Sequence, residues 1–131
     1  MIGDREHHIR ARLGEIGGEE PAGPERELLA RLLTSYTSKT LAGVDRLAEL
    51  IRGGDVAAVR DQAHALKGSA SNLGVVTLAG LFAQLESAAR DGRMPDPETD
   101  LTAVREEYEL VEPVCRDIAA ELAKKPAPSG R

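Results

Sequence analysis

Apolar side chains recur at steps of three and four residues along most of this chain, which is the spacing of amphipathic helices. The longest series predicts a helix that begins near Pro24, a residue suited to a first helical turn, and ends at Gly53-Gly54. The positions that we expect on its apolar face are Leu28, Leu29, Leu32, Leu33, Tyr36, Leu41, Val44, Leu47, Leu50 and Ile51.

One shorter helix is predicted before this one in the sequence and one after it. The first covers about residues 5–13, with Asp4 as a candidate N-cap, and a Pro- and Gly-rich linker over 17–23 follows it. The other begins after Asp55, a second candidate N-cap, and ends before Gly74. Its apolar stripe consists of Val59, Ala63, Leu66, Ala70 and Leu73.

The C-terminal half of the chain predicts two more helices. A fourth helix has Thr77 as a candidate cap and ends at Asp91-Gly92. Its expected buried residues are Leu78, Leu81, Phe82, Leu85 and either Ala88 or Ala89. Asp96 and Pro97 form a cap and a first-turn proline for the fifth helix. Its apolar residues follow heptad-like steps at Leu101, Val104, Tyr108, Val111, Cys115, Ile118 and Leu122.

Pro113 interrupts the last helical pattern, and a proline in a helix interior costs about 3 kcal/mol. We therefore predict a kink or a split near Glu112. Five helical patterns, short loops and no strand pattern predict an all-α antiparallel four-helix bundle, with the short N-terminal helix packed across one end. The expected domain covers residues 1–123, and the polar tail 124–131 is expected to be disordered.

Composition narrows the possible functions. Only 2% of the residues are aromatic, so the core must be built from Leu, Val and Ala, which suits packed helices. The formal net charge is −5 and no basic cluster occurs, which argues against nucleic-acid binding. No apolar stretch approaches the ~20 residues that span a bilayer, and we see no signal peptide. With Cys115 as the single cysteine, no internal disulfide can form, and we expect a cytoplasmic protein.

Other reactive residue types carry weaker signals. Cys115 lies on the apolar stripe of the last helix, where we interpret it as a small buried hydrophobic residue. His7 and His8 are adjacent, so they project in different directions from a helix and form a poor metal-binding pair. We therefore predict no metal site.

The candidate chemistry lies in the third helix. His64, Lys67, Gly68 and Ser71 stand at i, i+3, i+4 and i+7 on one face, with Arg60 one turn earlier and the apolar stripe on the other side. The histidine is therefore expected to point to solvent, where neutral imidazole offers a nucleophilic ring nitrogen. Gly68 costs roughly 1 kcal/mol relative to alanine in a helix interior, and its lack of a side chain would let a partner approach the imidazole.

The run from His64 to Ser69, His-Ala-Leu-Lys-Gly-Ser, resembles the H-x-L-K-G-S signature of histidine-phosphotransfer (HPt) domains. The resemblance implies a helical bundle in which His64 is the phosphoacceptor, Lys67 steadies the phosphoryl group and Gly68 gives the partner room. It also implies a polar residue near the histidine on the next helix. Glu86 occupies the matching place and Gln84 is the alternative. A carboxylate there could orient the imidazole but would repel a bound phosphoryl group.

The resemblance also implies what the partners supply. No ATP-binding motif is found in the sequence, so the phosphoryl group must come from elsewhere, and we predict a phosphocarrier rather than an enzyme with independent turnover. The expected partners are receiver domains of response regulators, which would bring their own aspartates and Mg²⁺, and a hybrid sensor histidine kinase. A monomer is expected. The alternative is a helical docking module that binds a receiver or kinase without accepting phosphate.

Overall fold

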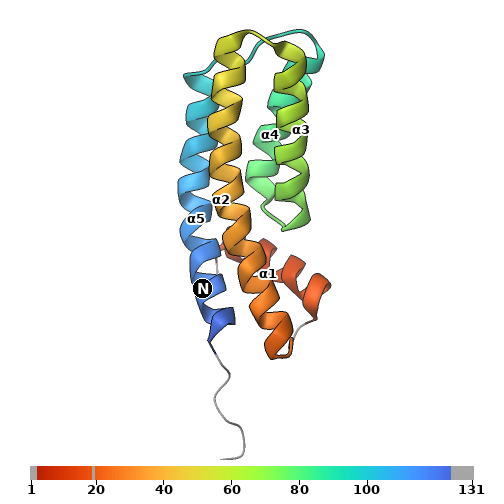
Figure 1. Ribbon diagram of the computed structural model, residues 1–131, viewed down its shortest axis with the longest axis vertical. Coiled ribbons are helices and arrows are strands. Elements are labelled where there is room, and N and C mark those ends of the chain that lie inside the picture. The colour runs from red at the N-terminus through yellow and green to blue at the C-terminus, as the bar shows by residue number, and fades with distance from the viewer. Residues whose placement is uncertain (1–2, 19, 125–131) are drawn as a thin grey trace, which may run out of the picture.

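The computed structural model describes residues 3–18 and 20–124, and these residues form five helices. The helices are α1 (Asp4–Gly17), α2 (Gly23–Gly53), α3 (Val56–Asn72), α4 (Val76–Arg90) and α5 (Thr99–Ala123). Figure 1 shows α2 and α5 running the length of the molecule, with the α3–α4 hairpin beside their upper half and α1 across the lower part. The predicted all-α bundle with a short additional N-terminal helix is therefore confirmed.

Aliphatic side chains from all five helices make the core, as the low aromatic content predicts. The largest fully buried side chains are Phe82, Ile9, Leu33, Leu47, Leu78, Ile118, Val44, Val59, Val104, Val111 and Cys115. The predicted stripe of α3 is buried throughout, from Val59 to Leu73. Because the stripe occupies one side of α3, the polar residues between its members face away from the bundle.

The apolar face predicted for α2 is partly wrong. Leu28, Leu32 and Leu41 are exposed, whereas Ala30 and Thr40 are buried. At 3.6 residues per turn, the three leucines lie on the flanks of the face whose centre carries Leu33 and Leu47. An apolar residue on the flank of a long helix is buried only if a neighbouring helix covers it. The pattern alone does not show which flank is covered.

The N-caps are predicted correctly at one helix and wrongly at three, the third being α5, where Glu98 and not Asp96 is the N-cap. Asp55 caps α3, since its carboxylate accepts a hydrogen bond from the amide of Ala58 at 3.0 Å. Asp4 and Thr77 instead lie inside the first turns of α1 and α4, whose N-caps are Gly3 and Val75. The carbonyl of Val75 already accepts the first helical bond, from Ala79 at 3.0 Å, because the turn at Gly74 brings the chain into helical geometry early.

The fifth helix begins slightly later than predicted and is not split. The Asp96 carboxylate accepts hydrogen bonds from the amides of Glu98 and Thr99, which lowers its pKa, and the regular helix starts at Thr99. Of the kink or split predicted near Glu112, the split is wrong, because Pro113 lies inside one continuous helix. A proline at this position removes one amide donor, and the carbonyl it would have bonded belongs to Glu109, an exposed residue that water can hydrate.

The prediction of a disordered tail concerns residues that fall largely outside the described part of the chain. Lys124 is the C-cap of α5, and residues 125–131 are not described. No helix in the described ranges is long and apolar enough to cross a membrane.

Candidate phosphotransfer site

The imidazole of His64 projects from the middle of α3 into solvent, with 67% of its side chain exposed. Val59, Ala63 and Leu66 bury the opposite side of the helix, and this register turns His64 outward. A ring in this position is accessible to a macromolecular partner.

Glu86 of α4 lies against the inner edge of the imidazole. Its side chain is only 6% exposed, and its Oε2 lies 2.8 Å from Nδ1 of His64. An ionised carboxylate can only accept a hydrogen bond, so Nδ1 carries the proton and donates a hydrogen bond to Glu86. In the neutral ring the lone pair then belongs to Nε2, the outer nitrogen. The contact with Glu86 therefore leaves Nε2 as the ring nitrogen that could act as a nucleophile.

Two cations complete the surroundings of Glu86. Nζ of Lys67 lies 2.6 Å from Oε1, and Nη2 of Arg90 lies 2.8 Å from Oε2, the oxygen that also contacts His64. We call His64, Lys67, Glu86 and Arg90 the Glu86 cluster. The hydrogen bond from Lys67, followed by that from His64, lowers the pKa of the Glu86 carboxyl despite its burial. The carboxylate therefore stays ionised.

The remaining members of the predicted strip lie on the same face of α3 but outside this cluster. Apart from the adjoining residues and the nearby backbone of α3 itself, no described atom lies within 4 Å of the position that a Cβ at Gly68 would take, so no packing contact requires glycine there. Ser71 is exposed, and Arg60 pairs with Asp61 at 3.2 Å instead of joining Glu86. Open space at Gly68 is what approach by a partner needs.

Comparison with known proteins agrees with this geometry. The family model described as the Hpt domain matches residues 27–113, which is more than half of the chain. The chain belongs to the Hpt domain family. Its fold is also similar to the crystal structure of histidine-containing phosphotransfer protein B (HptB) from Pseudomonas aeruginosa. The two chains are 26% identical with a TM-score of 0.73, and the match covers 92% of this chain and 95% of that one. A search of curated proteins finds no match.

These matches confirm the resemblance drawn from the sequence and identify a histidine-phosphotransfer module of two-component systems. Hpt domains of this kind are phosphocarrier modules without an ATP site of their own. The family match covers α3 and α4 entirely, whereas α1 lies outside it.

The two candidates for the polar residue on the next helix of this Hpt domain occupy different places. Glu86 makes the contact with His64. Gln84 is exposed and lines a depression between α4 and α5, together with Arg93 and Asp100. Sequence reasoning missed Arg90, although its i+4 spacing from Glu86 is that of a helical ion pair.

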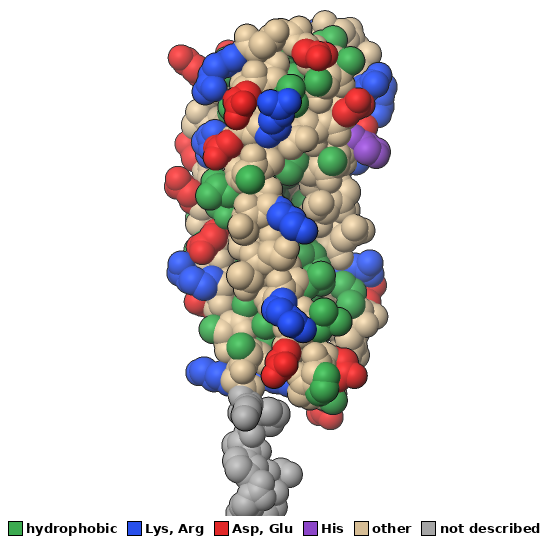
Figure 2. Space-filling view, viewed as in Figure 1, with side chains coloured by type: hydrophobic (Ala, Val, Ile, Leu, Met, Phe, Trp, Pro, Cys, Tyr) green, Lys and Arg blue, Asp and Glu red, His purple; other side chains and the backbone are tan. Residues whose placement is uncertain are grey.

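A groove with apolar walls runs along α1, α2 and α3 beside the histidine-bearing face. Its lining residues are Arg12, Ile16, Leu32, Ser35, Tyr36, Lys39, Thr40, Leu66, Ser69, Asn72 and Leu73. Ile16 and Leu32 are exposed apolar side chains here, and Leu28 continues the exposed apolar surface of α2. Figure 2 shows hydrophobic side chains gathered over the lower part of the molecule, where α1 and α2 meet.

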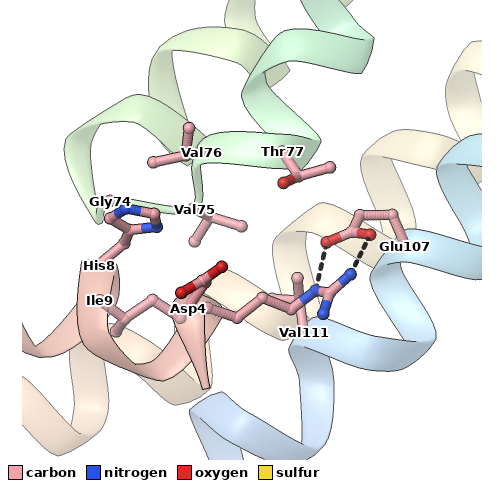
Figure 3. Close-up of a pocket in the computed structure, with 10 residues that line it drawn as sticks. Asp4, His8, Ile9, Gly74, Val75, Val76, Thr77, Glu107 and Val111 are labelled. Carbon is pink, nitrogen blue, oxygen red and sulfur yellow. Dashed lines mark hydrogen bonds and ion pairs between the residues drawn. The ribbon is translucent and has the colours of Figure 1, made fainter. Parts of the chain in front are cut away.

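A separate cavity of about 190 Å³ lies where the start of α1 meets the α3–α4 turn and α5 (Figure 3). Arg5 donates from Nε and Nη2 to the two carboxylate oxygens of Glu107, at 2.7 and 2.9 Å. His8 also lines this cavity. In the residues for which coordinates are described, no group of three His, Cys, Asp or Glu side chains is placed to hold a metal ion. We interpret the cavity as part of the junction that holds α1 in place.

Proposed function

We propose that this Hpt domain accepts a phosphoryl group on Nε2 of His64 from an aspartyl phosphate of one receiver domain and returns it to the aspartate of another. The observation that supports this most directly is the hydrogen bond between Nδ1 of His64 and the buried Glu86. It leaves the outer nitrogen as the one available nucleophile on an exposed ring.

The transfer exchanges one bond to phosphorus for another. The Nε2 lone pair attacks phosphorus in line, the N–P bond forms, and the P–O bond to the donor aspartate breaks, leaving a carboxylate on the receiver. The Nδ1 proton stays on the ring, so phosphohistidine carries a positive ring that remains hydrogen-bonded to Glu86. A positive ring is a good leaving group, which favours the onward transfer to the second aspartate. The proton on Nδ1 therefore favours both the transfer to His64 and the transfer away from it.

Lys67 and Gly68 have separate roles in this proposal. The Nζ of Lys67 lies one helical turn from His64 and can turn from Glu86 towards the phosphoryl oxygens, where its positive charge offsets theirs. Gly68 leaves space for the receiver, and Ser71 extends the polar face. We expect the Mg²⁺ that assists the reaction to be bound by the receiver domain, not by this chain.

The apolar groove supports a receiver domain as the partner. It adjoins the reactive face through Asn72, which lines the groove and lies one helical turn after Gly68 on α3. A receiver that reaches Nε2 would also cover this groove and bury Ile16 and Leu32. A hybrid kinase that carries such a receiver is the expected donor. A monomeric state and a cytoplasmic location stay predictions.

The decisive experiment uses a receiver domain phosphorylated with radiolabelled phosphate. We expect label to move to the wild-type protein in an acid-labile, base-stable form, and His64→Gln to receive none. His7→Gln, which replaces an exposed histidine on α1, is the matched control and should be labelled like the wild type. Without a receiver, no phosphoryl compound should be turned over.

Two results would contradict the proposal. Either the wild type takes no label, or His64→Gln takes as much as the wild type. A domain that only docks would bind the receiver through the groove with or without His64, and His64→Gln would then preserve its signalling output.

A further inference from the structure

The carboxylate of Glu86 raises an electrostatic difficulty for phosphate transfer. Before transfer its charge is offset by Lys67 on Oε1 and by Arg90 on Oε2. If Lys67 turns to the phosphoryl group, Oε1 loses its cation while a second negative group arrives at the other end of the imidazole. Until the imidazole ring gains its positive charge, a carboxylate left without compensation would oppose the arriving phosphoryl group.

We propose that Arg90 is a positioning residue that neutralises Glu86 while Lys67 binds the phosphoryl group, an inference that rests on the proposed function. Its Nη2 binds Oε2, which is also the acceptor for Nδ1 of His64, so it stays bound when Oε1 is released. Arg90 therefore keeps Glu86 hydrogen-bonded and electrically compensated throughout the transfer.

The ion pair between Arg90 and Glu86 differs from an ordinary surface ion pair because one of its partners is buried. The side chain of Arg90 is 62% exposed, but that of Glu86 is only 6% exposed. Pairs in which both partners are exposed contribute little, because water solvates each charge when the other is removed. Glu86 has little contact with water while its partners are in place, so the loss of Arg90 removes one of its three hydrogen-bond donors and acts through it on His64.

The test compares transfer rates from a phosphorylated receiver to His64 in two backgrounds. With Glu86 present, Arg90→Gln should lower the rate by about three- to tenfold, the range expected when a charged group loses one charge-assisted hydrogen bond in a partly exposed site. Arg90→Lys keeps the charge and should retain most of the rate. In the Glu86→Gln background there is no charge to neutralise, so adding Arg90→Gln should change the rate by less than about twofold.

Arg93→Gln is the matched control. Arg93 is an exposed arginine three residues further along, pairs with Asp91 at 3.3 Å and makes no contact with Glu86 in the described structure. Its replacement should leave the rate unchanged. Thermal unfolding of every variant shows whether a slower rate reflects loss of folded protein.

Three outcomes would overturn the inference. Arg90→Gln could transfer as fast as Arg93→Gln, or Arg90→Lys could be as slow as Arg90→Gln. Arg90→Gln could also slow transfer equally in the wild-type and the Glu86→Gln backgrounds, which would mean that Arg90 contacts the phosphoryl group or the receiver directly. Each outcome is read from label on His64 of the otherwise unaltered protein. Failure of the proposed function would instead appear as no label on the wild type.

Discussion

At the scale of single residues, Gly68 is the position where stability and function oppose each other. It lies within α3, one turn from His64, in helical backbone with open space where a Cβ would be. Glycine in a helix interior loses more backbone entropy on folding than alanine does. No described neighbour requires a glycine here, which is consistent with the proposal that Gly68 leaves room for the partner.

This argument predicts opposite effects for Gly68→Ala. The free energy of unfolding, measured in urea, should rise by about 0.5–1 kcal/mol. The rate of phosphoryl transfer from a receiver should fall, and Gly68→Gln should lower it further. Gly14→Ala is the control, since Gly14 lies within α1 and also has no described atom within 4 Å of the Cβ position. It should stabilise without slowing transfer. Full transfer activity in Gly68→Gln would refute the role of Gly68 in partner approach.

Cys115 carries a reactive thiol, but its burial makes the thiol unreactive. It is buried in the core of α5, and burial raises the pKa of its thiol to about 12. Thiols react as thiolates, which such a group does not form near neutral pH. Its interpretation as a small buried hydrophobic residue is confirmed, and we assign it no chemistry.

The site could be predicted from the sequence as far as it lies on one helix. The spacing of His64, Lys67 and Gly68 within α3 puts them on one face whatever the rest of the fold does. The choice between Glu86 and Gln84 could not be made in this way. Two positions apart on a helix are about 200° apart in direction, so the choice depends on how α4 is rotated against α3.

At the scale of elements, two glycines with positive φ end the helices of the α3–α4 hairpin. Gly74 follows α3 with φ +73°, and Gly92 follows α4 with φ +80°. Their surroundings differ. A Cβ on Gly74 would lie 2.5 Å from the backbone oxygen of His8 in α1, whereas at Gly92 no described atom lies within 4 Å. Gly74 therefore serves both as a helix terminus and as the contact point for α1.

Replacing each glycine by alanine separates these two roles. Gly92→Ala should lose about 1–2 kcal/mol of unfolding free energy, the cost of a left-handed conformation for a residue with a Cβ. Gly74→Ala carries the same cost and must also displace the backbone of α1, so its loss should be larger, about 2–4 kcal/mol. Urea unfolding of both variants gives the difference. Equal losses would show that the contact between Gly74 and His8 adds nothing.

The starts of the elements were harder to predict than their existence. Asp55 is a residue type that favours N-caps, and it is the N-cap of α3. Thr77 is also a favourable type, but the N-cap of α4 is Val75, two residues earlier. The turn at Gly74 brings the chain into helical geometry before Thr77 is reached, and this geometry has no signal in residue type alone. Local preference is a weak guide where a neighbouring turn sets the backbone.

At the scale of the whole molecule, helical periodicity was enough to predict the bundle, because each helix has its own apolar stripe. The position of α1 across one end was predicted, but the contacts that attach it there could not be. The attachment depends on Arg5 meeting Glu107 across 102 positions of sequence, and on Arg12 donating to the backbone oxygen of Asn72 at 2.8 Å. Contacts between residues so far apart in the sequence do not appear in the periodic pattern of apolar residues. The helix they hold lies outside the residues that the family match covers.

The ion pair between Arg5 and Glu107 allows the attachment of α1 to be tested. Glu107 is buried beside Val111 and Thr77, so Arg5→Met leaves a buried carboxylate without its two donors and should cost about 1–3 kcal/mol in urea unfolding. Arg46→Met breaks an exposed pair with Glu49 at 3.5 Å and should cost less than about 0.5 kcal/mol. The double replacement of Arg5 and Glu107 by Met should regain most of the loss, because it removes the buried carboxylate that Arg5→Met leaves without donors. If the double variant is as unstable as Arg5→Met, the loss comes from the packing of Arg5 and not from the stranded charge.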